Sequence, residues 1–288
     1  MARIAPVAQR AQSHAFSASN IGPANVGEDI DPFIGIDHFV MRVPVFPPHP
    51  HAGFSALTYL FEDSEGSFTN RDSLGHSLLI APGDLHWTTA GRGIIHEEIP
   101  EVAGQRIHGL QIFVNLPSTM KHVAPSIHHV TRSQTPLVEQ AGMRVRVVAG
   151  AFEGVSSPLE SPTPITLLDG RLDAGACLSH PLPGTVNVFV YVLDGEVAIG
   201  PPTAPRYVQA GQVASLAHDG DALEILGAQR TPAWLVVFAG EPIGEPLVSA
   251  GPFVMNTERE IERAYADYRS GRMGKLSATP SAAWLSRA

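Results

Sequence analysis

The stretch HPHAGFSALTYLF, residues 49–61, joins two histidines to a run of strand-forming residues. In a β-strand, residues two apart point to the same face, so His49 and His51 project together if the segment is extended. Pro50 favours extension because its ring fixes φ and biases the preceding residue away from helix. The stretch therefore predicts a strand edge or barrel mouth that presents two imidazoles.

A second histidine motif lies in AGRGIIHEEIP, residues 90–100. If this segment is a strand, His96 and Glu98 share one face and Glu97 points the other way. A zinc-protease helix with the pattern HExxH is excluded, because position 100 is proline and a helix would break there. If the two strands are neighbours in a barrel, three imidazoles and one carboxylate converge on one point.

The four side chains His49, His51, His96 and Glu98 are typical ligands of a transition metal. Neutral imidazole suits Zn, Cu, Fe and Ni, and a carboxylate adds a hard anionic donor. A structural zinc site normally uses cysteine, whereas this chain contains a single cysteine, Cys177. Four protein ligands leave two positions open on an octahedral ion such as iron, manganese or nickel. We therefore predict a catalytic or ligand-binding metal site rather than a structural one.

The rest of the chain predicts an all-β fold. Short runs rich in Val, Ile, Leu, Phe and Thr alternate with turns rich in Gly and Pro, a pattern typical of a sandwich or barrel. The two halves repeat each other, because Tyr59 and Gly83 correspond to Tyr191 and Gly211. A length of 288 residues fits two domains. We therefore expect two similar β-barrels with a linker near residues 132–140.

The second half lacks the predicted ligands. At the offsets of the repeat, Pro181 and Pro183 take the places of the first histidine pair, and Glu224 and Leu226 take those of the His–Glu pair. His180 remains without a companion. We therefore expect the second barrel to carry no metal and to cover or shape the first.

One segment, residues 257–270, reads as a helix. Thr257 and Glu260 have the spacing of a capping box, and Ile261, Ala264, Tyr265 and Tyr268 form one apolar stripe. Gly271 stands where a C-terminal glycine belongs. The helix is expected on the outside of a barrel.

Composition excludes several classes of partner. Nineteen basic and 28 acidic residues give a formal charge of −9, and no basic stripe exists for a nucleic-acid backbone or an anionic membrane. No stretch approaches the length of a membrane span, and the N-terminal residues lack a signal-peptide pattern. These features predict a soluble cytoplasmic protein. The lone cysteine is expected in the core.

Three further polar residues lie in or beside predicted strands. His86 follows a turn at Pro82-Gly83-Asp84, and His108 and Gln111 lie in RIHGLQIFVNLP. A metal-bound histidine normally needs a partner for its other ring nitrogen, so His108 and Gln111 are candidates for that role. A structural role is the alternative for all three.

Longer motifs carry a resemblance to a known family. HPHAGF is followed by NRDSLG at 70–75, PGDLHWTTAGRGIIH at 82–96, GLQIFVNLP at 109–117, GPFVMNT at 251–257 and ADYRSGRMG at 266–274. This set resembles the pirin family of bicupins over nearly the whole chain. Two departures are His86, where many relatives carry Gln, and a slightly longer turn at 63–68.

The resemblance implies an all-β fold of two cupin (jelly-roll type) barrels that face each other, with a C-terminal helix at 257–270. It implies an N-terminal barrel at 1–133 with the metal and a C-terminal barrel at 134–288 without one. His49, His51, His96 and Glu98 are then the ligands of one divalent ion. The expected ion is Fe(II), with Mn, Ni, Cu or Zn as alternatives.

Two functions follow from the resemblance. Some pirins act as quercetin 2,3-dioxygenases, which open a flavonol ring with O2, and Glu98 is then the candidate base that takes the substrate's hydroxyl proton. Other pirins are regulatory cofactors, which implies a metal- or redox-responsive protein that binds a protein partner without catalysis. A third reading is a bicupin that the ion merely stabilises. The expected ligands of the leading reading are a small aromatic phenol and O2.

Overall fold

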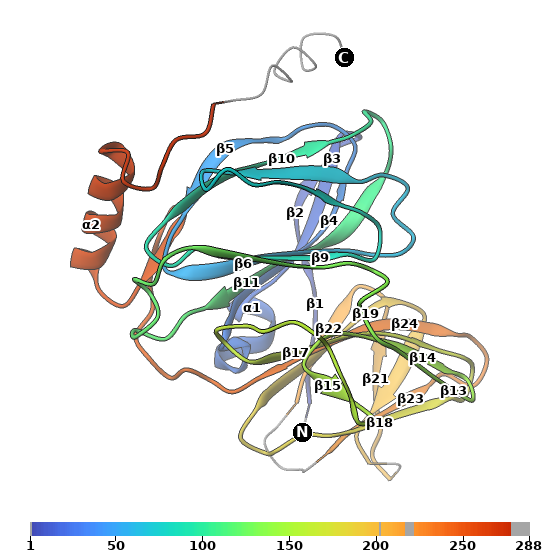
Figure 1. Ribbon diagram of the computed structural model, residues 1–288. Coiled ribbons are helices and arrows are strands. Elements are labelled where there is room, and N and C mark those ends of the chain that lie inside the picture. The colour runs from blue at the N-terminus through green and yellow to red at the C-terminus, as the bar shows by residue number, and fades with distance from the viewer. Residues whose placement is uncertain (1, 202, 217–221, 278–288) are drawn as a thin grey trace. The chain divides into compact units, whose positions relative to one another are not determined.

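The computed structural model describes residues 2–201, 203–216 and 222–277 (Figure 1). They form two compact units, each built from three chain segments. As far as these residues are described, the first barrel comprises Gln9–Ser19, Ile36–Arg132 and Ile243–Ala288. The second barrel comprises Met1–Ala8, Asn20–Gly35 and Ser133–Pro242.

The two terminal segments lie in the opposite barrels from those expected. The chain divides after Arg132, next to the expected boundary, but β1 (Arg3–Pro6) pairs antiparallel with β22 (Gln212–Ser215) of the second barrel. The C-terminal helix, α2 (Glu258–Arg269), belongs to the first barrel. The division at 133/134 therefore needs correction at both ends, because pairing and packing across the chain override sequence order.

Two sheets build the first barrel. The larger sheet has the strand order β12-β9-β6-β11-β4-β3-β2, and the smaller has the order β5-β10-β7-β8. Their bounds are β2 (Ala8–Gln12), β3 (Phe16–Ile21), β4 (Phe33–Met41), β5 (Phe46–His51), β6 (Phe54–Leu60), β7 (Phe68–Asp72), β8 (Ser77–Ile80), β9 (Leu85–Thr89), β10 (Ile94–Pro100), β11 (Ile107–Asn115) and β12 (Ser126–Val130).

The second barrel repeats this arrangement. Its larger sheet has the order β1-β22-β19-β24-β17-β14-β13, and its smaller sheet has the order β18-β23-β20-β21. The remaining bounds are β13 (Leu137–Gln140), β14 (Met143–Ala149), β17 (Ile165–Leu172), β18 (Cys177–Pro181), β19 (Asn187–Asp194), β20 (Glu196–Ile199), β21 (Arg206–Gln209), β23 (Ala222–Gly227) and β24 (Ala233–Gly240), with a short hairpin of β15 (Ala151–Phe152) and β16 (Val155–Ser156) and the short helices α1 (Pro23–Val26) and η1 (Gly27–Ile30). The matching sheets confirm the predicted pair of β-barrels.

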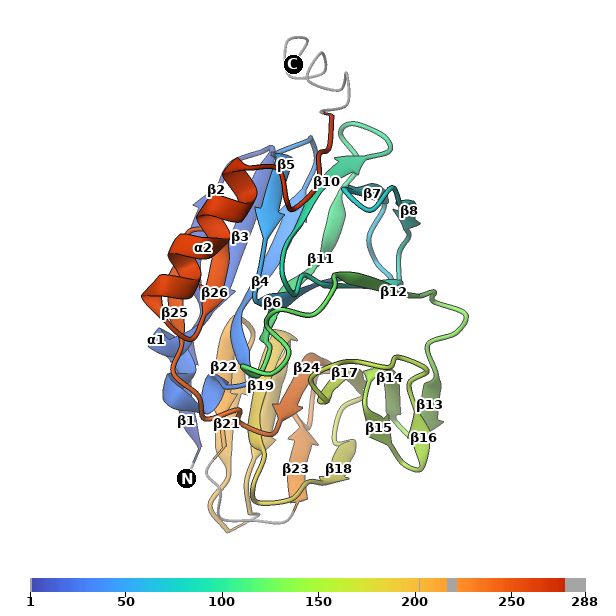
Figure 2. The same ribbon diagram turned by 60° about the vertical axis from the view of Figure 1, so that its left-hand side comes forward.

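The C-terminal helix has the predicted ends. The Thr257 side chain accepts a hydrogen bond from the backbone N–H of Glu260, and Gly271 has a φ of 77°, the left-handed conformation that ends many helices. Figure 2 shows α2 lying along β25 (Val248–Ala250) and β26 (Phe253–Met255). Within the described part of the chain, no helix is long and apolar enough to cross a membrane.

The helix braces the strands that carry the predicted ligands. Its buried residues, Ile261 and Ala264, share one apolar cluster with Phe253, Ala52 and Ile95. Ala52 follows His51 in the chain, and Ile95 precedes His96. Neighbouring residues of a strand point to opposite faces, so this cluster packs behind the two strands.

Cys177 is exposed, which corrects the prediction that it lies in the core. Burial alternates along β18, and Cys177 lies on the outer face together with Ser179 and Pro181. Its Sγ lies 3.9 Å from a carboxylate oxygen of Glu224. A single cysteine in an apolar stretch of sequence does not show which face of its strand is buried.

Candidate metal centre

The two histidine motifs lie on adjacent strands. β5 and β10 pair antiparallel, with His49 opposite His96 and His51 opposite Ile94. The register shifts between His96 and Glu98, so that Glu98 lies opposite Phe46. This pairing confirms that the two strands are neighbours, as the convergence of the four side chains requires.

Three imidazoles converge at one point. His49, His51 and His96 each offer a ligand atom, and these atoms all lie within 4.8 Å of one another. The closest pair is Nε2 of His49 and Nε2 of His96, which are 3.1 Å apart. His51 and His96 are buried, and His49 is half-buried.

The outer ring nitrogens show which atoms face inward. Nδ1 of His96 donates to Oδ1 of Asn70 at 2.8 Å, and Nδ1 of His49 donates to the carbonyl of Pro47 at 2.9 Å. A neutral imidazole has one N–H and one lone pair, so both Nε2 atoms present lone pairs. Two lone pairs 3.1 Å apart repel each other unless a cation lies between them. This donor set fits a metal ion.

The ring of His51 has a different environment. Its Nδ1 is buried and makes no hydrogen bond with the described residues. The backbone of Pro252 lies near the ring and raises its pKa, although the geometry falls short of a hydrogen bond. Pro252 belongs to the C-terminal segment, which therefore reaches the candidate site.

Burial keeps the three imidazoles neutral. It lowers the pKa of His51 to about 3, with a smaller contribution from the neighbouring His49. Burial also lowers the pKa of His96 well below its usual value, and that of His49 in the same direction. Neutral imidazole is the form that binds metals, so protons compete little for these three nitrogens near neutral pH.

Glu98 lines the same cavity as the three histidines, but its carboxylate lies outside the group of atoms within 4.8 Å. The side chain is buried, and burial raises its pKa to about 7, although the hydroxyl of Thr58 opposes this effect. Thr58 Oγ1 lies 3.0 Å from Glu98 Oε1. Glu97 points away, as expected, and pairs with Arg71 at 2.6 Å.

A small cavity adjoins these groups. Its volume is about 110 Å³, and aromatic side chains from four strands form much of its wall: Phe16, Phe39, Phe46 and Phe113. Phe46 is 41% exposed and meets Phe16 edge to face at 5.5 Å between ring centroids. Phe54 packs against the rings of His51 and Phe113.

His86 points into the first barrel but belongs to none of these groups. It pairs across the sheet with Thr58 on β6, and neither of its ring nitrogens makes a hydrogen bond with the described residues. Burial lowers its pKa to about 3, with a further contribution from His129. It is therefore a neutral side chain inside the barrel.

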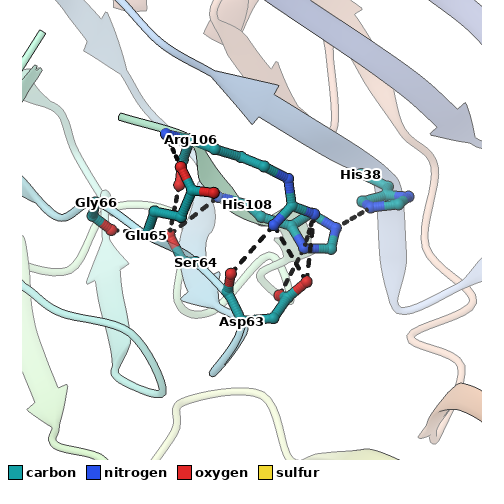
Figure 3. Close-up of polar contacts among 7 residues, drawn as sticks. All are labelled: His38, Asp63, Ser64, Glu65, Gly66, Arg106 and His108. Carbon is teal, nitrogen blue, oxygen red and sulfur yellow. Dashed lines mark hydrogen bonds and ion pairs between the residues drawn. The ribbon is translucent and has the colours of Figure 1, made fainter. Parts of the chain in front are cut away.

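His108 does not support a metal ligand, contrary to one of the two roles considered for it. Figure 3 shows its ring between Asp63 and His38. Nδ1 donates to Oδ1 of Asp63 at 2.7 Å, so Nε2 accepts from Nε2 of His38, also at 2.7 Å. Arg106 pairs with the same Asp63. The cluster ties the turn after β6 to β11 and β4.

A buried lysine joins the first barrel to the C-terminal segment. Lys121 is fully buried, and its ammonium donates to the carbonyls of Gly53 (2.9 Å) and Val254 (3.3 Å) and to Oδ1 of Asn115 (2.7 Å). Gly53 has a φ of 82°, and a Cβ there would lie 1.8 Å from the Val254 carbonyl oxygen. Only glycine fits this contact, two residues after His51.

In the second barrel, the corresponding positions do not converge. His180 faces inward and packs edge to face on Phe152 at 5.3 Å. Glu224 lies on the outer face of β23, where Ser179 donates to its carboxylate at 2.5 Å. The barrel also contains a cavity of about 710 Å³ with mostly apolar walls.

Comparisons with known proteins agree with the sequence motifs. The family model "Pirin" matches residues 3–114, and "Pirin C-terminal cupin domain" matches residues 167–274. Pirin of Homo sapiens is 39% identical over 248 residues, which cover 86% of this chain and 84% of that protein. A pirin-like protein of Solanum lycopersicum is 37% identical, with coverages of 86% and 83%.

A solved structure extends the comparison to the fold. The crystal structure of quercetin 2,3-dioxygenase from Acinetobacter baumannii has a TM-score of 0.83 and 27% sequence identity, and the match covers 96% of this chain and 100% of that one. A match that covers 96% of this chain extends over both barrels.

Proposed function

The chain belongs to the pirin family, and on this premise we propose that it is a metal-dependent dioxygenase, which opens the ring of a flavonol-type phenol with O2. The main support is the set of three neutral imidazoles whose ligand atoms lie within 4.8 Å of one another. The likeness to a quercetin 2,3-dioxygenase at 27% identity favours this reaction over others that use a cupin metal site.

We assign one divalent ion to His49, His51, His96 and Glu98. Fe(II) is the first choice, and Mn, Ni, Cu and Zn are alternatives, because imidazole and carboxylate suit all of them to some degree. The Glu98 carboxylate lines the same cavity as the three imidazoles, and this supports its inclusion in the ligand set. A bound divalent ion would make a coordinated phenol hydroxyl more acidic.

Glu98 is the proposed base. Burial raises the pKa of the metal-free side chain to about 7, and a bound cation would lower it. Glu98 would then be a carboxylate at neutral pH, the form that accepts a proton. The carboxylate lines the cavity that a phenol would enter, so it can accept the hydroxyl proton.

The cavity determines how much of a substrate enters. Its volume of about 110 Å³ is below the roughly 300–1,000 Å³ of pockets that enclose a whole drug-sized ligand. Only the chelating end of a flavonol would therefore lie inside. The remaining rings would extend past Phe16 and Phe46, whose faces and edges suit aromatic contacts.

The test uses protein loaded anaerobically with Fe, Mn, Ni or Cu in turn. Quercetin and air are then added, and flavonol absorbance and released CO are followed. We expect turnover with at least one metal, and a fall in kcat of about 10²–10⁴-fold in Glu98→Gln at saturating metal. Glu224→Gln makes the same chemical change on the exposed face of the second barrel and should keep wild-type turnover.

The result also separates the two functions of the family. A metal- or redox-responsive binding protein would take up the metal but leave quercetin unchanged with every ion. That outcome would contradict the dioxygenase proposal. It would direct attention to protein partners whose binding depends on the oxidation state of the metal.

A further inference from the structure

Thr58 bridges the two sheets of the first barrel at Glu98. It lies in the middle of β6, is 2% exposed, and stands opposite Gln111 in the pairing of β6 with β11. Its hydroxyl oxygen lies 2.8 Å from Oε1 of Gln111 and 3.0 Å from Oε1 of Glu98. Glu98 comes from β10 of the smaller sheet.

The number of protons decides the direction of these hydrogen bonds. A threonine hydroxyl carries one proton and two lone pairs, so it can donate to one of two neighbouring oxygens. A carboxylate that binds a cation carries no proton and can only accept. When Glu98 is a metal ligand, the Thr58 hydroxyl therefore donates its hydrogen bond to the Glu98 carboxylate.

Gln111 must then offer a donor to Thr58. The two ends of an amide group have nearly the same shape, so hydrogen bonds decide its orientation. With its NH2 group toward Thr58, Gln111 donates to the hydroxyl oxygen, and the hydroxyl donates to the carboxylate. Each of these two hydrogen bonds, from Gln111 to Thr58 and from Thr58 to Glu98, then has one donor and one acceptor.

We propose that Thr58 and Gln111 are positioning residues for the metal ligand Glu98, with Gln111 donating to Thr58 and Thr58 donating to Oε1 of the carboxylate. The inference rests on the proposed metal site. In this arrangement Oε1 of Glu98 accepts from Thr58, and Oε2 can bind the cation. Partners that orient a metal ligand in this way typically change metal affinity by about 10–100-fold when they are removed.

The test measures the dissociation constant of Zn(II), in competition with a chromogenic chelator. Thr58→Val removes the hydroxyl at constant shape, and we expect about 10–100-fold weaker binding. Thr58→Ser keeps the hydroxyl and should bind almost as tightly as wild type. Gln111→Met should weaken binding by a smaller factor than Thr58→Val.

A double variant tests whether Gln111 acts on Glu98 through Thr58. Because Gln111 acts through Thr58, adding Gln111→Met to Thr58→Val should have little further effect, whereas independent roles would multiply the two factors. Thr88→Val is the matched control, because the Thr88 hydroxyl is buried on the next strand, β9, and makes no hydrogen bond with the described residues. Thermal melting shows which variants are folded.

The outcomes separate this inference from the function on which it rests. If wild type fails to bind one Zn(II) per chain, the proposed metal site is wrong. If wild type binds Zn(II) and folded Thr58→Val binds as tightly, the metal site stands and the positioning role is refuted. Equal losses in Thr58→Val and Thr58→Ser would likewise refute a role for the hydroxyl.

Discussion

His96→Ala is expected to weaken Zn(II) binding by about 10²–10³-fold, if the 10–16 kcal/mol of a four-ligand site divides equally among its ligands. His96 is the most buried of the three histidines. It is buried, its Nδ1 is fixed by Asn70, and its Nε2 faces the Nε2 of His49. Competition with a chelator of known affinity gives the two dissociation constants.

His86→Ala is the matched control for this variant. The same side chain is removed from the same barrel at a similarly buried position, but among the described residues His86 belongs to no group of converging ligand atoms. We expect both variants to lose stability and only His96→Ala to lose affinity for the metal. Similar losses of affinity would mean that general damage to the barrel, and not a lost ligand, weakens binding.

Metal affinity is expected to rise with pH up to about pH 7 and then to level off. Burial raises the pKa of Glu98 to about 7, so below this pH a proton must leave before the carboxylate can bind an ion. Each pH unit below 7 then costs roughly tenfold in affinity. The three histidines add little to this slope, because burial lowers their pKa values and they are already neutral.

The slope of the logarithm of metal affinity against pH distinguishes this site from a site of three histidines with ordinary pKa values. Three imidazoles with the usual pKa near 6.5 would each compete with a proton, and below about pH 6 the logarithm of the affinity would rise by up to three per pH unit. With Zn(II) from about pH 5.5 to 8, we expect a slope near one below about pH 7 and a slope near zero above it. In Glu98→Gln the slope should disappear. A slope of two or more would contradict the burial of the imidazoles.

The sequence predicted which of these side chains share a strand face, because their spacing is local. Residues two apart share a strand face, so the pairs His49–His51 and His96–Glu98 could be placed before any strand pairing was known. The pairing of β5 with β10 then followed the prediction. The helix also followed, because its cap residue Thr257 and apolar stripe are local patterns.

Contacts across the barrel could not be predicted in the same way. Thr58 and Gln111 looked like unrelated polar residues of two strands, and only the register of β6 with β11 brings them together. His108 was as good a candidate for a metal-supporting role as Gln111, but it faces Asp63 and His38 instead. A polar residue in a strand does not reveal which neighbour it meets.

The largest difference from the expected fold is that the N-terminal segment belongs to the second barrel and the C-terminal segment to the first. A boundary read along the chain assigns the C-terminal helix to the nearer barrel. The structure places β26 and α2 behind the ligand strands of the first barrel, where Phe253 packs with Ala52 and Ile95. Lys121 fixes the same contact through Val254 and Gly53. Ser73 accepts a hydrogen bond from the N–H of Ile95 on β10 and donates one to the carbonyl of Met273. The position of β10 therefore depends on residues far along the chain.

Anomalous diffraction from crystals of the Zn(II)-loaded protein tests the central claim most directly. We expect one strong peak in the first barrel, with nitrogen atoms of His49, His51 and His96 and an oxygen atom of Glu98 at about 2.0–2.2 Å. A protein without a peak among these side chains, or with an ion that leaves two of the imidazoles unbound, would contradict the proposed metal centre.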